Sequence, residues 1–322
     1  MKTTSSVAAA PAGALKPRKK KNNIFKRFWQ TRFLFALLVP TIVFYIIFAY
    51  MPMWGIRFAF YDYNPWAGLE GSDFVGLKHF TTFLSSPIAG RVIKNTVVIS
   101  IQSLMINWPI TIFFALVLNE VRFPRYKKVV QTVSYLPHFL STVVMCGIVT
   151  SFLAPETGAI NMLIKAFGGE SIYFMAKSQY YRTIWHVAGL WKGVGWGTIV
   201  YLAAISAVDP TLYEAARLDG AGRWRQMWNI TLPSIAPTVI TMLILKMGDI
   251  LDTSLEKTLL LQHAATIDVS EVIASYVYKV GIGQSNYSFS TAIGLWQMLV
   301  NLILVLITNW ISNKVTDSGG IF

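Results

Sequence analysis

Apolar residues run along this chain in long stretches, and these stretches predict membrane-spanning helices. Each holds about 20 residues, the length at which an α-helix crosses a hydrocarbon core of ~30 Å. We expect six spans, with the boundaries Phe33–Tyr50, Val92–Leu118, Val129–Leu153, Thr183–Ile205, Ile235–Leu255 and Ser290–Ile311. The sequence therefore predicts an all-α polytopic membrane protein with a six-helix domain over residues 31–322.

The residues before the first span have a different composition. The tail is assigned to residues 1–30, of which the first 23 are rich in Ala, Ser and Pro and carry a basic run that ends at Lys21. They contain too little apolar surface to fold alone. A cleaved signal peptide is not expected, because the apolar stretch that follows is longer than the roughly 7–15 residues of such peptides. We expect a basic cytoplasmic tail.

Composition and charge support this interpretation. Of 322 residues, 54% are apolar and 13% are charged, against about 45–50% and about 25% in soluble domains. With both termini inside, 17 Lys and Arg fall in cytoplasmic segments and nine in outer ones, which agrees with the positive-inside rule. Nine of the 17 cytoplasmic residues lie in the tail, and without them the two sides would carry eight and nine. The net charge of +13 is therefore mainly an orientation signal and does not indicate nucleic-acid binding.

Sequence signals for catalysis are absent. The chain has no G-x-x-x-x-G-K-[ST] loop for nucleotide phosphates and no G-x-S-x-G elbow. Its four histidines are far apart and lack the spacing of metal ligands, and its single cysteine, Cys146, is expected to be a small buried apolar residue. We assign no catalytic residue, metal or cofactor to this chain.

The segment between the fourth and fifth spans predicts a short helix outside the membrane. Asp209 is a good N-cap, Pro210 suits the first helical position, and Gly220 can take the left-handed conformation that ends a helix. Ala215 and Ala216 permit close approach by another surface. We expect a helix of about two to three turns that a partner protein grips.

This segment resembles the EAA motif of the membrane subunits of ATP-binding-cassette (ABC) importers. Glu214-Ala215-Ala216 is followed after three residues by Gly220 and after nine more by Ile230-x-Leu232-Pro233. In that family the short helix is the coupling helix, which docks into a cleft of a separate ATPase subunit. The resemblance implies that the loop over about residues 206–233 couples this chain to an ATPase. The implied contact residues are Glu214, Ala215, Ala216, Arg217, Leu218, Asp219 and Gly220.

Other segments are similar to permeases of the carbohydrate-uptake group (maltose type), and most of all to LplB-type polysaccharide and oligosaccharide permeases. These segments are Tyr63–Trp66, Phe74–Phe80, Tyr135–Phe139, Pro155–Gly158 and Thr291–Leu295. The resemblance implies a type I ABC importer permease fold in a bacterial cytoplasmic membrane. It further implies a heterodimer with a second permease, two ATPase subunits that bind ATP and Mg²⁺, and an external solute-binding protein that delivers an oligosaccharide.

Polar residues inside the fifth predicted span mark a candidate substrate path. A charge at the centre of a membrane helix costs ~2.5–3.5 kcal/mol on the insertion scale, so it should not face lipid. Lys246, Asp249 and Thr253 fall at i, i+3 and i+7, and Asp252 directly precedes Thr253. These residues are expected to share a helical face. The alternative is that Lys246 and Asp249 simply neutralise one another.

The fourth predicted span offers a second face. Gly189, Gly193 and Trp196 fall at i, i+4 and i+7, with Trp191 and Lys192 alongside. Aromatic faces and polar side chains typically hold sugars, whereas glycines also serve simple helix packing. If the cargo is an acidic oligosaccharide, Lys192 and Lys246 acquire a role in binding it.

Two other classes of function stay open at this point. Lys192, Asp249 and Asp252 would suit an ion relay in a secondary transporter, and a membrane scaffold would explain the outer segments. Residues 54–90 are aromatic and rich in turn signals, which indicates either an external docking surface or an interfacial aromatic belt. The EAA-like segment favours the importer, because neither alternative explains it.

Overall fold

The computed structural model describes residues 31–315, which form two compact units divided between residues 55 and 56. The first unit contains α2 (Arg32–Tyr45) and a π-helical turn, η1 (Ile46–Tyr50), and the 3₁₀ segment η2 (Met51–Phe60) begins in it and continues into the second unit. Ala36–Phe60 is long and apolar enough to cross a membrane, and no residue in its most apolar window is buried. This agrees with the predicted first span, whereas the predicted tail over residues 1–30 lies outside the described residues.

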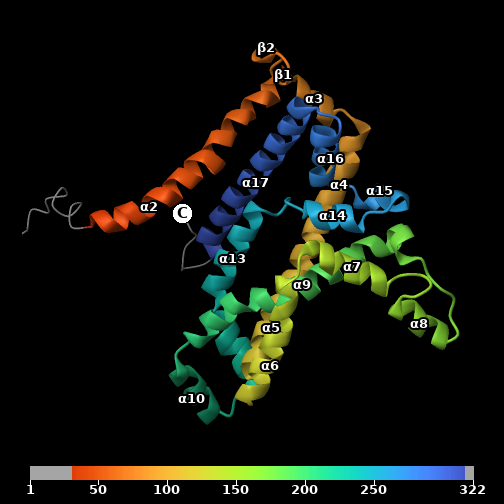
Figure 1. The fold of residues 1–322 in the computed structure, drawn as a ribbon. Coiled ribbons are helices and arrows are strands. Elements are labelled where there is room, and N and C mark those ends of the chain that lie inside the picture. The colour runs from red at the N-terminus through yellow and green to blue at the C-terminus, as the bar shows by residue number, and fades with distance from the viewer. Residues whose placement is uncertain (1–30, 316–322) are drawn as a thin grey trace, which may run out of the picture. The chain divides into compact units, whose positions relative to one another are not determined.

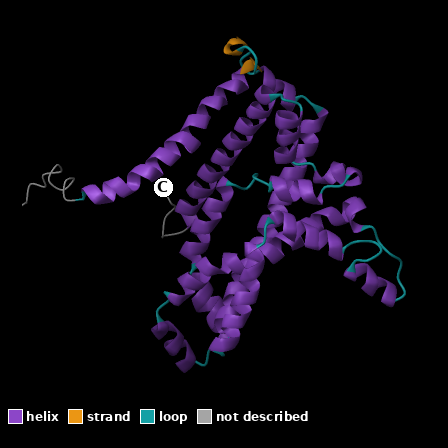
Figure 2. Ribbon diagram, viewed as in Figure 1, coloured by secondary structure: helices purple, strands orange, loops and turns teal. Residues whose placement is uncertain are grey.

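The segment after η2 forms a β-hairpin where the sequence indicated a loop. Strand β1 (Tyr61–Asn64) pairs antiparallel with β2 (Gly68–Phe74), and α3 (Lys78–Leu84) follows. The side chain of Asn64 accepts a hydrogen bond from the Trp66 N–H at 3.0 Å, and Gly68 has a φ of +67°. These two features close the turn and leave Trp66 97% exposed at its tip. Figure 2 shows this hairpin in an otherwise helical molecule.

The second predicted span is part of a longer helix. It runs through α4 (Pro87–Gln102), the π-helical η3 (Ser103–Asn107) and α5 (Trp108–Glu120). Ser86 caps its start by accepting from the Ala89 N–H at 3.2 Å. The π-helical turn adds one residue to the helix near its middle, a distortion that often occurs at functional sites.

The third predicted span, expected as one helix over Val129–Leu153, is instead a pair of helices joined by a sharp bend. Helix α6 (Pro124–Tyr135) and the 3₁₀ turn η4 (Leu136–Phe139) meet α7 (Thr142–Phe152) at an angle of 103°. The turn carries Pro137, Leu140 has extended backbone angles, and Ser141 caps a new helix through the Val144 N–H. The apolar stretch therefore contains its own helix stop and start.

A short helix, α8 (Ala159–Ala166), and a 3₁₀ turn, η5 (Phe174–Ala176), lead to α9 (Ser178–Ser206), which contains the fourth predicted span. Helix α9 packs along α5 and α6. The segment between the fourth and fifth predicted spans then forms α10 (Pro210–Leu218). In Figure 1, α10 lies at the end of the molecule opposite the hairpin.

The fifth predicted span is also interrupted. It is preceded by α11 (Arg223–Gln226), the π-helical η6 (Met227–Thr231) and α12 (Leu232–Ser234), which bend by 58° into α13 (Ala236–Gly248). Helix α13 ends at Gly248, so Asp249, Asp252 and Thr253 do not share a helical face with Lys246. A single helix over Ile235–Leu255 was therefore a wrong expectation, because apolar content does not reveal where a helix stops.

Short helices connect this break to the last span. They are α14 (Leu255–Leu261), η7 (Ala264–Thr266), α15 (Ile267–Ser270), α16 (Ile273–Tyr278) and the π-helical η8 (Lys279–Gly283). Helix α17 (Tyr287–Val315) follows and contains the predicted sixth span. By length and composition, three helices in residues 31–315 could cross a membrane, or five if each bent pair is one span. The six spans expected from the sequence include these five and also α9, which contains the fourth predicted span.

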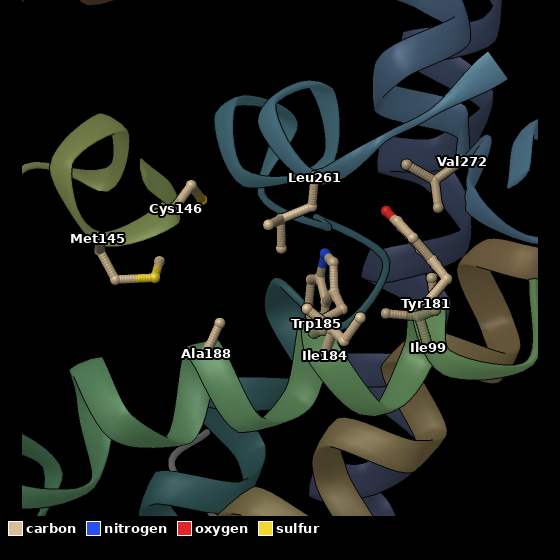
Figure 3. Close-up of a cluster of buried hydrophobic side chains, with 9 residues drawn as sticks. All are labelled: Ile99, Met145, Cys146, Tyr181, Ile184, Trp185, Ala188, Leu261 and Val272. Atoms are coloured by element: carbon tan, nitrogen blue, oxygen red, sulfur yellow. The ribbon is translucent and has the colours of Figure 1, made fainter. Parts of the chain in front are cut away.

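Buried apolar side chains in residues 56–315 form three clusters. The largest joins α4, α7, α9, α14 and the start of α16, and Figure 3 shows Cys146 and Met145 of α7 on one side of it. Cys146 is 2% exposed, as expected for a small buried residue. The second cluster joins α5 and α9 to η6 and α13, and the third joins α3, α4, α16 and α17. The second cluster thus packs α9, which precedes α10 in the chain, against η6 and α13, which follow it.

Candidate functional site

Helix α10 has the capping that its sequence predicted. The Asp209 carboxylate accepts a hydrogen bond from the Thr211 N–H at 2.9 Å, which holds the pKa of this exposed carboxyl below its usual value. Pro210 is the first helical residue, and Gly220 has a φ of +75°. The Ala221 N–H donates to the Ala216 carbonyl at 2.8 Å and closes the C-terminal end. The helix is therefore defined by its own residues at both ends.

Side-chain contacts tie α10 to the elements that flank it. The hydroxyls of Tyr213 and Thr231 are 3.0 Å apart, which joins the helix to η6. Gln226 donates to the Ala221 carbonyl at 2.7 Å, and Arg223 donates to the Glu120 carbonyl at the end of α5 at 3.2 Å. Tyr213 therefore joins α10 itself to η6, whereas Arg223 joins α11 (Arg223–Gln226), which follows α10 in the chain, to the end of α5.

The predicted contact residues of α10 differ in what they face. Glu214 and Arg217 line a polar cavity of about 740 Å³ between α10 and the connection after α5, together with Glu120 and Arg122. Leu218 is 90% exposed at the end of the helix. A large apolar side chain exposed on a short helix is typical of a contact with another protein. Ala215, Asp219 and Gly220 are also exposed, and Ala216 is half-buried.

The predicted residues of α9 meet the turn between α6 and α7. The Trp196 indole stacks on the His138 imidazole, with ring centroids 4.4 Å apart and planes 1° from parallel. Nζ of Lys192 donates to Oγ1 of Thr142 at 3.0 Å. A Cβ added to Gly193 would have no heavy atom within 4 Å, so this face of α9 is open there. His138 was not singled out as a binding residue, because its partner is distant in sequence.

The predicted residues of the fifth span divide into two groups. Asp249 and Asp252 are exposed and line a groove of about 480 Å³ between the end of α13 and α17, whereas Thr253 is buried with its hydroxyl unpaired. Lys246 is exposed. Within the described residues, no ion pair joins Lys246 to Asp249. Mutual neutralisation therefore does not explain these charges.

Two amides of α17 hold the break after α13 in place. Oδ1 of Asn301 accepts from the Leu251 N–H at 3.3 Å, and Nε2 of Gln297 donates to the Leu251 carbonyl at 3.0 Å. Non-helical backbone at membrane depth needs such partners, because lipid offers none. Neither Gln297 nor Asn301 was predicted from the sequence as a functional residue. Their spacing of i and i+4 inside an apolar span was the available signal.

A charged network fixes the short helices that precede α17. The Glu271 carboxylate lies 3.2 Å from an Arg91 guanidinium nitrogen and 2.9 Å from Lys279 Nζ. Asn95 donates to the carbonyls of Asp268 and Glu271, and Arg182 of α9 donates to the Asn95 side chain at 3.2 Å. This network links α4, α9, α15 and η8. Among residues 31–315, no group of three or more His, Cys, Asp or Glu side chains could hold a metal ion.

Known proteins resemble this chain over almost its full length. It is 42% identical to the polygalacturonan/rhamnogalacturonan transport system permease protein YteP of Bacillus subtilis (strain 168), over 99% of both chains. It is 40% identical to Protein LplB of the same organism, over 90% of this chain and 91% of that protein.

A solved structure has the same fold. A chain in the crystal structure of a bacterial alginate ABC transporter, in complex with its alginate pentasaccharide-bound periplasmic protein, superposes with a TM-score of 0.84 and 37% identity. The match covers 93% of this chain and all of that one. Residues 108–317, which include α9, α10 and α17, match the family described as "Binding-protein-dependent transport system inner membrane component". This chain therefore belongs to that family and is an inner-membrane permease subunit of an ABC transporter.

Proposed function

We propose that this chain imports oligosaccharides that carry carboxylate groups, as one of two permease subunits of an ATP-driven, binding-protein-dependent transporter. The observation that carries the proposal is α10, a capped and exposed helix whose EAA-like sequence lies within the family match. The names of two relatives support the choice of cargo, because polygalacturonan, rhamnogalacturonan and alginate are all acidic polymers.

Coupling to ATP hydrolysis is assigned to the exposed side of α10. ATPase subunits bind ATP and Mg²⁺ and grip this helix through Glu214, Ala215, Ala216, Arg217, Leu218, Asp219 and Gly220. When the ATPase pair closes, α10 moves and carries η6 with it through the contact of Tyr213 with Thr231, and α11, which follows α10, passes the movement to α5 through Arg223. The path then changes from inward-facing to outward-facing, and hydrolysis resets it.

The substrate path is assigned to two surfaces of the chain. One is the open face of α9 at Gly193 and Trp196, and the other is the groove that contains Asp249 and Asp252. Lys246 and Thr253 belong to the same path. The aromatic face of Trp196 suits a sugar ring, and the second permease subunit encloses the path from the opposite side.

The membrane topology proposed here has six spans, with α9 as the fourth and both termini in the cytoplasm. Residues 1–30 form a basic tail, and residues 31–322 form the permease domain with its coupling loop at about residues 206–233. The hairpin and α3 then lie outside, where a solute-binding protein delivers its cargo.

Co-purification and flux separate this proposal from its alternatives. An importer permease retains a second permease and an ATPase, and the reconstituted complex takes up uronate oligosaccharides only with ATP. A secondary transporter, with Asp249 and Asp252 in an ion relay, would support gradient-driven flux with this chain alone. A scaffold would do neither.

A further inference from the structure

A buried cation that no acid neutralises lies beside the proposed substrate face of α9. Lys257, in α14, is 8% exposed, and its Nζ lies 3.1 Å from the centroid of the Trp185 ring. Nζ also lies 3.4 Å from the Trp185 carbonyl oxygen. Within the described residues, no carboxylate oxygen lies within 4.0 Å of this ammonium. Burying an unpaired charge costs free energy, so such a lysine needs a functional reason.

The ammonium occupies the space left by a glycine. A Cβ added to Gly189 would lie 2.8 Å from Nζ of Lys257 and 3.8 Å from Nδ2 of Asn107. Two nitrogen donors from different elements thus lie near one point of α9, and Nδ2 of Asn107 also donates to Oγ of Ser103 at 3.4 Å. Asn107 belongs to the π-helical turn η3, and its Oδ1 is buried without a partner.

Other buried polar atoms nearby in the chain also lack hydrogen-bond partners. Nδ1 of His186, one turn before Gly189, is buried without a hydrogen-bond partner, and so is the Thr253 hydroxyl near the start of α14. Lys192 and Lys246 add positive charge that repels the Lys257 ammonium. A carboxylate beside Lys257 would offset this repulsion and the cost of burying the ammonium, whereas a neutral group would not.

The position lies on the proposed sugar path. Gly189, Gly193 and Trp196 share one face of α9, and Gly193 is one turn, about 6 Å, along the helix from Gly189. The face is open at Gly193. A four-carbon lysine stem can swing its ammonium over that distance.

We propose that Lys257 binds a carboxylate of the passing oligosaccharide beside Gly189, with the Asn107 amide as the second donor. Lys257 then selects acidic over neutral sugars. This inference rests on the proposed function and adds the residue that gives it charge specificity.

The test compares one uronate oligosaccharide with its carboxyl-reduced, neutral counterpart of the same length, in the complete reconstituted complex. Lys257→Gln should raise the half-saturating concentration for the acidic oligosaccharide about tenfold, the loss of one charge-assisted hydrogen bond, and leave the neutral one unchanged. Gly189→Ala should act in the same direction by displacing the ammonium. Lys165→Gln, at an exposed lysine of α8, is the matched control.

The outcomes separate this inference from the proposed function. Equal losses for both sugars in Lys257→Gln would mean that Lys257 only packs against Trp185, and no loss would remove it from the path. Lys257→Met provides a check on folding, because it keeps an unbranched apolar stem of similar length and removes only the ammonium that contacts Trp185. A wild-type complex that imports only the neutral sugar overturns the acidic cargo, and one that imports neither overturns the proposed function as well.

Discussion

The indole of Trp196 stacks on the imidazole of His138 with the two planes 1° from parallel. Trp196 is nevertheless 45% exposed, so one part of its ring system stays free while the other is held. The Phe139 ring packs against the same indole in a T-shaped arrangement, with the ring centroids 5.8 Å apart. The bend between α6 and α7 thus fixes the orientation of an aromatic surface on α9.

Replacing this aromatic surface should weaken oligosaccharide transport. Trp196→Ala removes the ring proposed to stack on a sugar, and we expect the half-saturating concentration for uptake to rise by roughly five- to tenfold. Trp191→Ala is the matched control, because Trp191 lies on the same helix but lines an apolar groove with Ile148 and Phe152. Transport kinetics in proteoliposomes measure both. Equal effects of the two variants would contradict a sugar contact at Trp196.

The end of α10 should not tolerate proline. Gly220 has a φ of +75°, whereas proline fixes φ near about −65°, so Gly220→Pro must distort the end of α10, the proposed coupling helix. We expect normal membrane insertion and loss of ATP-driven uptake. Gly222→Ala serves as control, since Gly222 has a φ of −69° and its Cβ would meet no atom within 4 Å. Normal uptake by a well-expressed Gly220→Pro variant would remove the coupling role of α10.

The exposed tip of α10 should carry part of the affinity for the ATPase. Leu218→Asp places a charge where an apolar side chain is 90% exposed, and we expect the ATPase to bind roughly tenfold or more weakly with unchanged permease stability. Phe167→Asp is a control of similar exposure, 89%, after α8. Binding of the purified ATPase to permease in detergent measures the effect. An unchanged affinity for Leu218→Asp would place the contact elsewhere on the helix.

Local signals in the sequence were sufficient to predict α10. Asp209, Pro210 and Gly220 act through the backbone beside them, so the boundaries of the helix could be predicted and are confirmed. The broken spans could not be predicted in this way. Pro137 gave a hint of the first break, but the end of α13 at Gly248 depends on Gln297 and Asn301, about 50 residues further along the chain.

The residues of the candidate path also divide into those that the local sequence predicts and those that depend on contacts with distant parts of the chain. Trp196 and Gly193 could be chosen from helical spacing alone, because they share one regular helix. His138 and Lys257 reach α9 through tertiary contacts with Trp196 and Trp185, which no spacing rule reveals. The expected shared face of Lys246, Asp249 and Thr253 failed because it assumed that a helix continued.

The break after α13 should depend on its two amide partners. Asn301→Leu leaves the Leu251 N–H without its acceptor, and we expect the free energy of unfolding to fall by ~1–3 kcal/mol. Met298→Leu changes an exposed side chain of the same helix and should have little effect. Thermal unfolding of the purified complex compares the two. Equal stability would mean that the amide does not hold the break.

The central claim, that this chain is a permease driven by a separate ATPase, is tested most directly by uptake in proteoliposomes. The complex is reconstituted with its second permease and ATPase subunits, with the solute-binding protein and a labelled uronate oligosaccharide on one side and ATP with Mg²⁺ on the other. We predict uptake that requires both the binding protein and ATP and that is lost in Gly220→Pro. Uptake by this chain alone, driven by an ion gradient without ATP, would contradict the account.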